Sequence, residues 1–191
     1  IVPHLAELVT GPAWVSLSAD GRRVAFDANV AVPGSPVGGC RLTHVWDRST
    51  AHLFTRPPGA GGTYAGCQAI VTEEPMLSAD GRSVALISVQ TDMDGAIDEN
   101  AAGDVFLWDI GSGAYRRPPT IDGTVPDSAS RQPTLSADGR YVAFDSMATA
   151  IAGGGLLSND VFVRDRQTGT TELVSVGVLG AYGYSAYQVL T

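Results

Sequence analysis

The chain alternates short apolar runs with polar turns, and the same order of runs and turns occurs three times. Its most regular element is the hexapeptide Leu-Ser-Ala-Asp-Gly-Arg, found at 17–22, 77–82 and 135–140. The copies begin 60 and then 58 residues apart, and such an interval indicates a repeated structural unit. Each copy is followed by a short β-prone segment with Val-Ala in the same place, at 23–27, 83–87 and 141–145.

An Asp-Gly pair between two β-prone segments predicts a hairpin, because Gly adopts positive φ without steric cost. The Ser and Asp side chains of the repeated turn can hydrogen-bond backbone amides within it. We therefore interpret Asp20, Asp80 and Asp138 as turn residues. The alternative is that these three carboxylates belong to an active site.

Two more runs complete each unit. The third runs, at 44–50, 104–109 and 160–165, are rich in β-branched and aromatic residues and predict strands. Polar turns then lead to fourth runs at 52–55, 115–117 and 172–175. One unit is therefore four short antiparallel strands, and radial repetition of such units describes a β-propeller. We expect Trp46 and Trp108, both in third strands, to pack between blades.

The recurring patterns Leu-Ser-x-Asp-Gly-Arg-x-Val-Ala-Phe and Asp-Val-Phe-Val-x-Asp-x-x-Thr-Gly resemble the TolB-like or PD40 (WD40-like) propeller repeat. The resemblance covers roughly residues 12–191 and implies an all-β propeller. The first unit departs from the pattern, with His44 in place of the Asp that begins the third strand. Propellers of this type serve as binding platforms, as lids on peptidases and as repeat domains of unknown role, so the resemblance implies a fold rather than an activity.

We expect one domain with three full four-stranded antiparallel blades and partial strands at both ends. Blade 1 and its linker span 12–73, blade 2 and its linker 74–131, and blade 3 132–178. Residues 1–11 are expected to form an outer strand of a neighbouring blade. Residues 179–191 are expected to form a linker and the first strand of a fourth blade.

Three blades do not comfortably close a ring, since propellers typically use four to eight. Three interpretations stay open. The chain is part of a larger propeller of about six to eight blades, which we favour. Alternatively, its end strands pair into a reduced closing blade. Or subunits complete one another by strand exchange, in a closed ring or an open filament.

The net charge and the hydropathy of the chain bear on which classes of partner it can bind. The net charge is −8 and the isoelectric point is about 4.6, which disfavours nucleic acid and anionic membranes as partners. All twelve basic residues are arginines. The sequence contains no run of 18 or more apolar residues, so we expect no membrane span.

The two cysteines bear on the compartment. Cys40 and Cys67 are the only two in the chain, and a disulfide between them would close a loop of 28 residues. The first residues, Ile-Val-Pro-His, lack an initiator Met, which favours a processed or excised N-terminus. We therefore expect an extracellular or periplasmic protein with this disulfide. The alternative is two buried free thiols.

One loop suggests metal chemistry. Residues 92–98 read Asp-Met-Asp-Gly-Ala-Ile-Asp, and this spacing lets carboxylates converge on a hard cation around a tight Gly turn. We predict a structural Ca²⁺ site formed by Asp92, Asp94, Asp98 and Asp104. The loop is not a complete EF-hand, because Gly103 stands where the Glu at position 12 is expected. The alternative is a solvated acidic loop.

The sequence shows no catalytic constellation. It has three histidines, no Gly-x-Ser-x-Gly motif and no His/Cys spacing typical of zinc. We predict a non-enzymatic binding or structural scaffold whose partners are proteins or copies of itself, bound through open strand edges. The alternatives are a self-assembling subunit, completed by its neighbours in a ring or filament, and the propeller portion of a larger hydrolase or peptidase.

Overall fold

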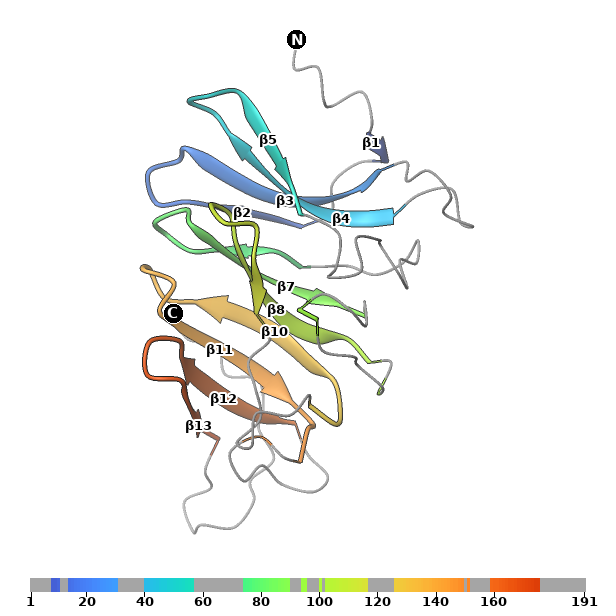
Figure 1. Ribbon diagram of the computed structural model, residues 1–191, viewed down its shortest axis with the longest axis vertical. Helices are drawn as coiled ribbons and strands as arrows, with labels where there is room; N and C mark the ends of the chain where they lie inside the picture. The colour runs from blue at the N-terminus through green and yellow to red at the C-terminus, as the bar shows by residue number, and fades with distance from the viewer. Residues whose placement is uncertain are drawn as a thin grey trace.

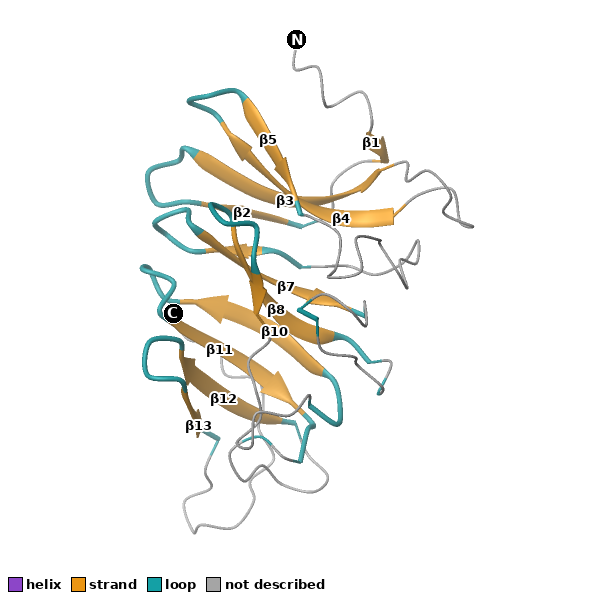
Figure 2. Ribbon diagram, viewed as in Figure 1, coloured by secondary structure: helices purple, strands orange, loops and turns teal. Residues whose placement is uncertain are grey.

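The computed structural model describes residues 8–10, 14–30, 40–56, 74–89, 94–95, 100, 102–116, 126–149, 151 and 159–175. Within these ranges the regular structure is entirely β-strand, without helix (Figure 2). Three antiparallel sheets follow one another in sequence order along the longest axis (Figure 1). The all-β architecture of four-stranded units predicted from the sequence is confirmed.

The four strands of each repeat form a simple meander. Blade 1 contains β1 (Leu8–Thr10), β2 (Val15–Leu17), β3 (Arg23–Val30), β4 (Cys40–Asp47) and β5 (His52–Thr55). Blade 2 contains β6 (Met76–Leu77), β7 (Ser83–Ser88), β8 (Asp104–Asp109) and β9 (Tyr115–Arg116). Blade 3 contains β10 (Ser130–Leu135), β11 (Tyr141–Ser146), β12 (Asp160–Asp165) and β13 (Thr170–Leu173). Within the repeat itself, β2–β5, β6–β9 and β10–β13, each strand is hydrogen-bonded to the next one in sequence.

Strand β1 differs from its prediction. It was expected to belong to a neighbouring blade, but it pairs antiparallel with β3 in the sheet of blade 1, with Leu8 opposite Val30. The reason lies in strand length. Strands β3 and β4 have eight residues against six in the other blades, and β2 covers only the first half of β3. The remaining edge of β3 presents unpaired backbone groups, and β1 pairs with them.

The repeated turn has the geometry that its residues predict. In blade 1 the Asp20 carboxylate accepts hydrogen bonds from Ser18 Oγ at 2.7 Å and the Arg22 amide at 2.9 Å. Gly21 has φ of 65°, the left-handed conformation that Gly adopts freely. The turns of blades 2 and 3 repeat these bonds through Asp80 and Asp138. The carboxylates are therefore structural residues, as predicted.

A second polar network was not foreseen. The Asp that ends the third strand of blade 1, Asp47, is buried and accepts from the guanidinium of Arg22 at 3.1 Å and from the Ser49 amide at 3.0 Å. These bonds, led by the one from Arg22, hold the pKa of Asp47 well below its usual range. In blade 3, Arg140 and Asp165 repeat the pair at 2.6 Å. In blades 1 and 3 the Arg of the repeated turn thus ties the first hairpin to the third strand.

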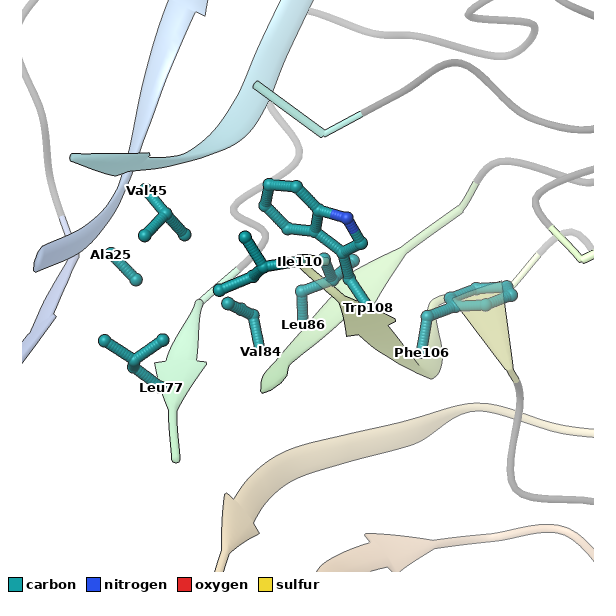
Figure 3. Close-up of a cluster of buried hydrophobic side chains, with 8 residues drawn as sticks. All are labelled: Ala25, Val45, Leu77, Val84, Leu86, Phe106, Trp108 and Ile110. Carbon is teal, nitrogen blue, oxygen red and sulfur yellow. The ribbon is translucent and has the colours of Figure 1, made fainter. Parts of the chain in front are cut away.

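Blades 1 and 2 pack through an apolar cluster (Figure 3). Ala25 and Val45 contribute from blade 1, and Phe54 packs against the edge of the cluster. Six residues contribute from blade 2: Leu77, Val84, Leu86, Phe106, Trp108 and Ile110. Trp108 is 2% exposed, which confirms its predicted place between blades. Burial of this surface is the main stabilising term between the two sheets.

Blades 2 and 3 pack through an equivalent cluster. Ala85, Val105 and Leu107 of blade 2 contact a set from blade 3 that consists of Val142, Phe144, Ala148, Ile151 and Phe162. Backbone hydrogen bonds also join the repeated turns of successive blades. The Ala19 amide donates to the Ala79 carbonyl at 2.9 Å, and the Asp80 amide donates to the Ala137 carbonyl at 3.0 Å. The three first hairpins therefore lie side by side at one end of the sheets.

The strand register corrects the alignment of blade 1. His44 lies opposite Phe26 in the middle of β4, in the position that Phe106 and Phe162 occupy in blades 2 and 3. The residue that corresponds to the first Asp of the other third strands is Leu42, opposite Ala28. The prediction that His44 replaces this Asp is therefore wrong. Strand β4 is longer and begins four residues before His44, so the start of the strand lies outside the motif on which the repeats were aligned.

Candidate functional site

The predicted calcium ligands fall partly outside the described residues. Asp92 and Asp98 are not described. Asp94 lies in a turn followed by Gly95 with φ of 85°, and Asp104 begins β8 as a buried residue. Within the described ranges, no three His, Cys, Asp or Glu residues gather as a metal site. The calcium site stays a prediction.

The disulfide prediction also lies outside the described part of the chain. Cys67 is not described, and for Cys40 only the backbone at the start of β4 is described. The expected first strand of a fourth blade, within 179–191, is not described either. Among the described residues, no helix is long and apolar enough to cross a membrane.

One candidate binding surface is the outward face of blade 1, which we call the blade 1 end face. It presents Val15 and Leu17, which are 71% and 57% exposed, together with half-buried Val24, Phe26 and Trp46. Cross-strand pairing places these side chains on one side of the sheet, opposite the side that contacts blade 2. In blade 2 the position of Leu17 is held by Leu77, only 7% exposed. The same apolar pattern is thus buried between blades and open at the end.

Blade 3 has the complementary surface, which we call the blade 3 end face. It presents Ala143 and Val163, both half-buried, beside exposed Tyr141. The equivalent residues of blade 2, Ala85 and Leu107, are buried against blade 3. The two end faces are therefore the two halves of the interface that recurs twice inside the molecule.

A second candidate is a cavity of about 710 Å³ in the wedge between blades 2 and 3, which we call the wedge cavity. Four arginines line it: Arg116 from β9, Arg140 from the repeated turn, and Arg164 and Arg166 at the end of β12. They represent a third of the basic residues in a chain with net charge −8. Two aspartates, Asp94 and Asp138, also line the cavity.

The arginines of the wedge cavity differ in their bonding. Arg140 is neutralised by Asp165. Arg164 donates to Thr171 Oγ1 at 3.0 Å, and burial lowers its pKa. Arg166 donates to the Gly139 carbonyl and to Ser83 Oγ, and so joins blade 3 to blade 2. Within the described part of the chain, Arg164 and Arg166 form no ion pair with a carboxylate, and Arg116 forms none either.

Comparison with known proteins bears on the fold. No family model matches the chain, and no curated protein matches it. Among solved structures, TolB from Acinetobacter baumannii is similar with a TM-score of 0.50 and 20% identity, over 87% of this chain and 32% of that one. The β-propeller domain of the Trilobed protease from Pyrococcus furiosus, described as having an open velcro topology, is similar with a TM-score of 0.51 and 9% identity, over 84% and 41%.

The chain has the TolB-like β-propeller fold. A structure from an analysis of two prolyl endopeptidases is also similar, with a TM-score of 0.52 and 17% identity over 88% of this chain and 22% of that one. This chain spans about a third of the length of TolB and less than half of each of the other two. At these identities the likeness shows the TolB-like fold alone.

Proposed function

We propose that this TolB-like propeller is a non-enzymatic binding scaffold whose partners are blade-type sheets, and that a second copy of the chain supplies one. The observation that carries the proposal is the exposure of both halves of the blade–blade interface at the two ends of the molecule. Apolar residues that are buried inside, such as Leu77, have exposed counterparts at the ends, such as Leu17. Exposed apolar patches of this kind mark interaction sites.

The polar residues of the repeat favour a scaffold over an enzyme. Ser18, Asp20 and Arg22 all bond within their own blade, and the other two blades use the corresponding serines and aspartates in the same way. A rigid frame with variable loops is a common arrangement for binding proteins. An extracellular or periplasmic location stays a prediction from Cys40 and Cys67, and the bound calcium stays a prediction from the 92–104 loop.

The association is expected to be head-to-tail. The blade 1 end face of one copy would cover the blade 3 end face of the next, and a contact of two different surfaces continues into rings or open assemblies. In sedimentation velocity, the 191-residue chain should show a mass above 19.8 kDa that rises with concentration. Leu17→Asp should reduce the mass to that of the monomer, because it places a charge in the buried contact. Val163→Asp, in the blade 3 end face, should do the same.

Mixing the two variants makes the test specific. Each variant keeps one intact end face, so an equimolar mixture of Leu17→Asp and Val163→Asp should form a dimer and stop there. Thr50→Asp, in the exposed turn after β4, should associate like the parent chain. A parent chain that stays monomeric at all concentrations, or variants that do not pair when mixed, would contradict the proposal.

A further inference from the structure

Three of the arginines that line the wedge cavity, between blades 2 and 3, stand at positions that are apolar in the contact between blades 1 and 2. The strand register aligns Arg116, opposite Leu107, with Phe54, opposite Val45. Arg164 and Arg166 flank Asp165 as Trp108 and Ile110 flank Asp109. The aligned apolar residues are therefore Phe54, Trp108 and Ile110.

These three apolar residues belong to the contact between blades 1 and 2, where Trp108 and Ile110 are buried in the apolar cluster and Phe54 packs against that cluster. Figure 3 shows the indole of Trp108 and the side chain of Ile110 on the side of blade 2 that faces Val45. The same place between blades 2 and 3 holds three arginines and an open volume of about 710 Å³. The scaffold therefore does not need the arginines for packing, since the neighbouring interface is built without them.

Arginines are the main hydrogen-bond donors in the lining of the cavity. Arg140 is compensated by Asp165, but Arg116, Arg164 and Arg166 form no carboxylate ion pair among the described residues. Of the two aspartates that line the cavity, Asp138 accepts hydrogen bonds from Ser136 Oγ and the Arg140 amide. Four arginines and two aspartates line the cavity, and two carboxylates beside it, Asp109 and Asp165, also interact with the arginines.

Guanidinium groups bind carboxylates and phosphates through paired N–H donors. A cavity of this volume is in the range that encloses small organic ligands, roughly 300–1,000 Å³. We propose that the wedge cavity binds a small organic anion with two or more negative charges, a phosphate ester or a polycarboxylate. Arg116 contacts it from blade 2, and Arg164 and Arg166 contact it from blade 3. Binding then bridges two blades and stabilises their contact.

The test uses pyrophosphate and citrate as probes, titrated into the 191-residue chain by calorimetry in 0.15 M NaCl. At least one probe should bind with a one-to-one stoichiometry and a dissociation constant below about 1 mM. Preference for pyrophosphate would assign the site to phosphate-bearing ligands, and preference for citrate would assign it to polycarboxylates. Absence of saturable binding for both probes would overturn the proposal.

The repeat offers a matched pair of variants. Arg166 and Arg48 occupy the same position after the third strand, and each donates through Nη1 to the glycine carbonyl of its own turn, Gly139 and Gly21. Only Arg166 lines the wedge cavity. Arg166→Gln should weaken probe binding by about tenfold or more, and Arg48→Gln should leave it unchanged. Equal losses in the two variants would show binding to surface charge in general and would overturn the proposal.

Arg116→Gln serves as a second variant in which weaker probe binding cannot be attributed to unfolding. The Arg116 side chain is exposed and forms no hydrogen bond within the described part of the chain, so its replacement should not lower the unfolding midpoint. The same variant should weaken probe binding by about tenfold. Unchanged binding in Arg116→Gln together with unchanged binding in Arg166→Gln would place the probe elsewhere and reject the site.

Discussion

Replacement of Trp108 by Ala should lower the free energy of unfolding by about 4 kcal/mol, the largest effect we expect from a single substitution. The Trp108 side chain belongs to the apolar cluster between blades 1 and 2 and is 2% exposed (Figure 3). Its removal deletes a large buried apolar surface and leaves a cavity between two sheets that cannot close completely. Urea unfolding followed by circular dichroism measures the change.

Two controls separate this packing effect from a general effect of tryptophan. Trp46 has the same strand position in blade 1 but lies half-buried on the blade 1 end face, so Trp46→Ala should cost only about 1–2 kcal/mol. Trp108→Phe should cost less than about 1.5 kcal/mol, because the ring volume is largely kept and the buried indole N–H has no hydrogen-bond partner among the described residues. Equal losses for Trp108→Ala and Trp46→Ala would contradict the stacking of the blades.

The second large effect is acid sensitivity caused by His44. This side chain is 1% exposed, stacks on Phe26 with ring centroids 5.4 Å apart, and has Nδ1 3.0 Å from Thr55 Oγ1. Burial lowers its pKa to about 4, and nearby Arg56 acts in the same direction. In the unfolded chain the His44 imidazole is therefore protonated near pH 6.5, whereas in the folded chain it is protonated only near pH 4. Stability should fall by about 3 kcal/mol as the pH drops through this window.

The repeat supplies the matching variant, His44→Phe, because Phe occupies this position in the other two blades. The variant should be more stable than the parent, and its advantage should grow by about 3 kcal/mol between pH 7 and pH 4. Asp145, whose pKa is raised by burial, titrates with the opposite sign in both proteins and cancels from the comparison. An advantage that does not change with pH would show that His44 is not buried in its neutral form.

The fold could be predicted from the sequence because its determinants are local. Turn chemistry is encoded in five consecutive residues, and Gly21, Gly81 and Gly139 adopt the positive φ that the hairpin needs. Strand bounds in blades 2 and 3 follow the runs of β-branched and aromatic residues closely, as in Asp104–Asp109 and Asp160–Asp165. In these segments local preference and tertiary packing favour the same structure.

Other features depend on contacts that no local pattern reveals. Strand β1 pairs with β3 only because β3 and β4 are longer in blade 1, a length that turn motifs do not indicate. Ala51, with φ of 53°, occupies a turn position that the other blades fill with Gly113 and Gly169, so the sequence gives no sign of the left-handed backbone there. The wedge cavity was missed for a different reason. Its signal, Arg in place of apolar residues, appears only when the repeats are aligned by strand register.

The central claim, that the sheets stack as consecutive propeller blades, is tested most directly by amide hydrogen exchange at the repeated turns. The pentapeptide Ser-Ala-Asp-Gly-Arg is identical in blades 2 and 3, so the intrinsic exchange rates of Asp80 and Asp138 match. The Asp80 amide donates to the Ala137 carbonyl of the next blade, whereas Asp138 lies in the turn of blade 3, where it is exposed. In the monomeric Leu17→Asp variant, Asp80 should exchange at least about tenfold more slowly than Asp138. Equal exchange at the two positions would show that the turns are not joined and would contradict the stacked arrangement.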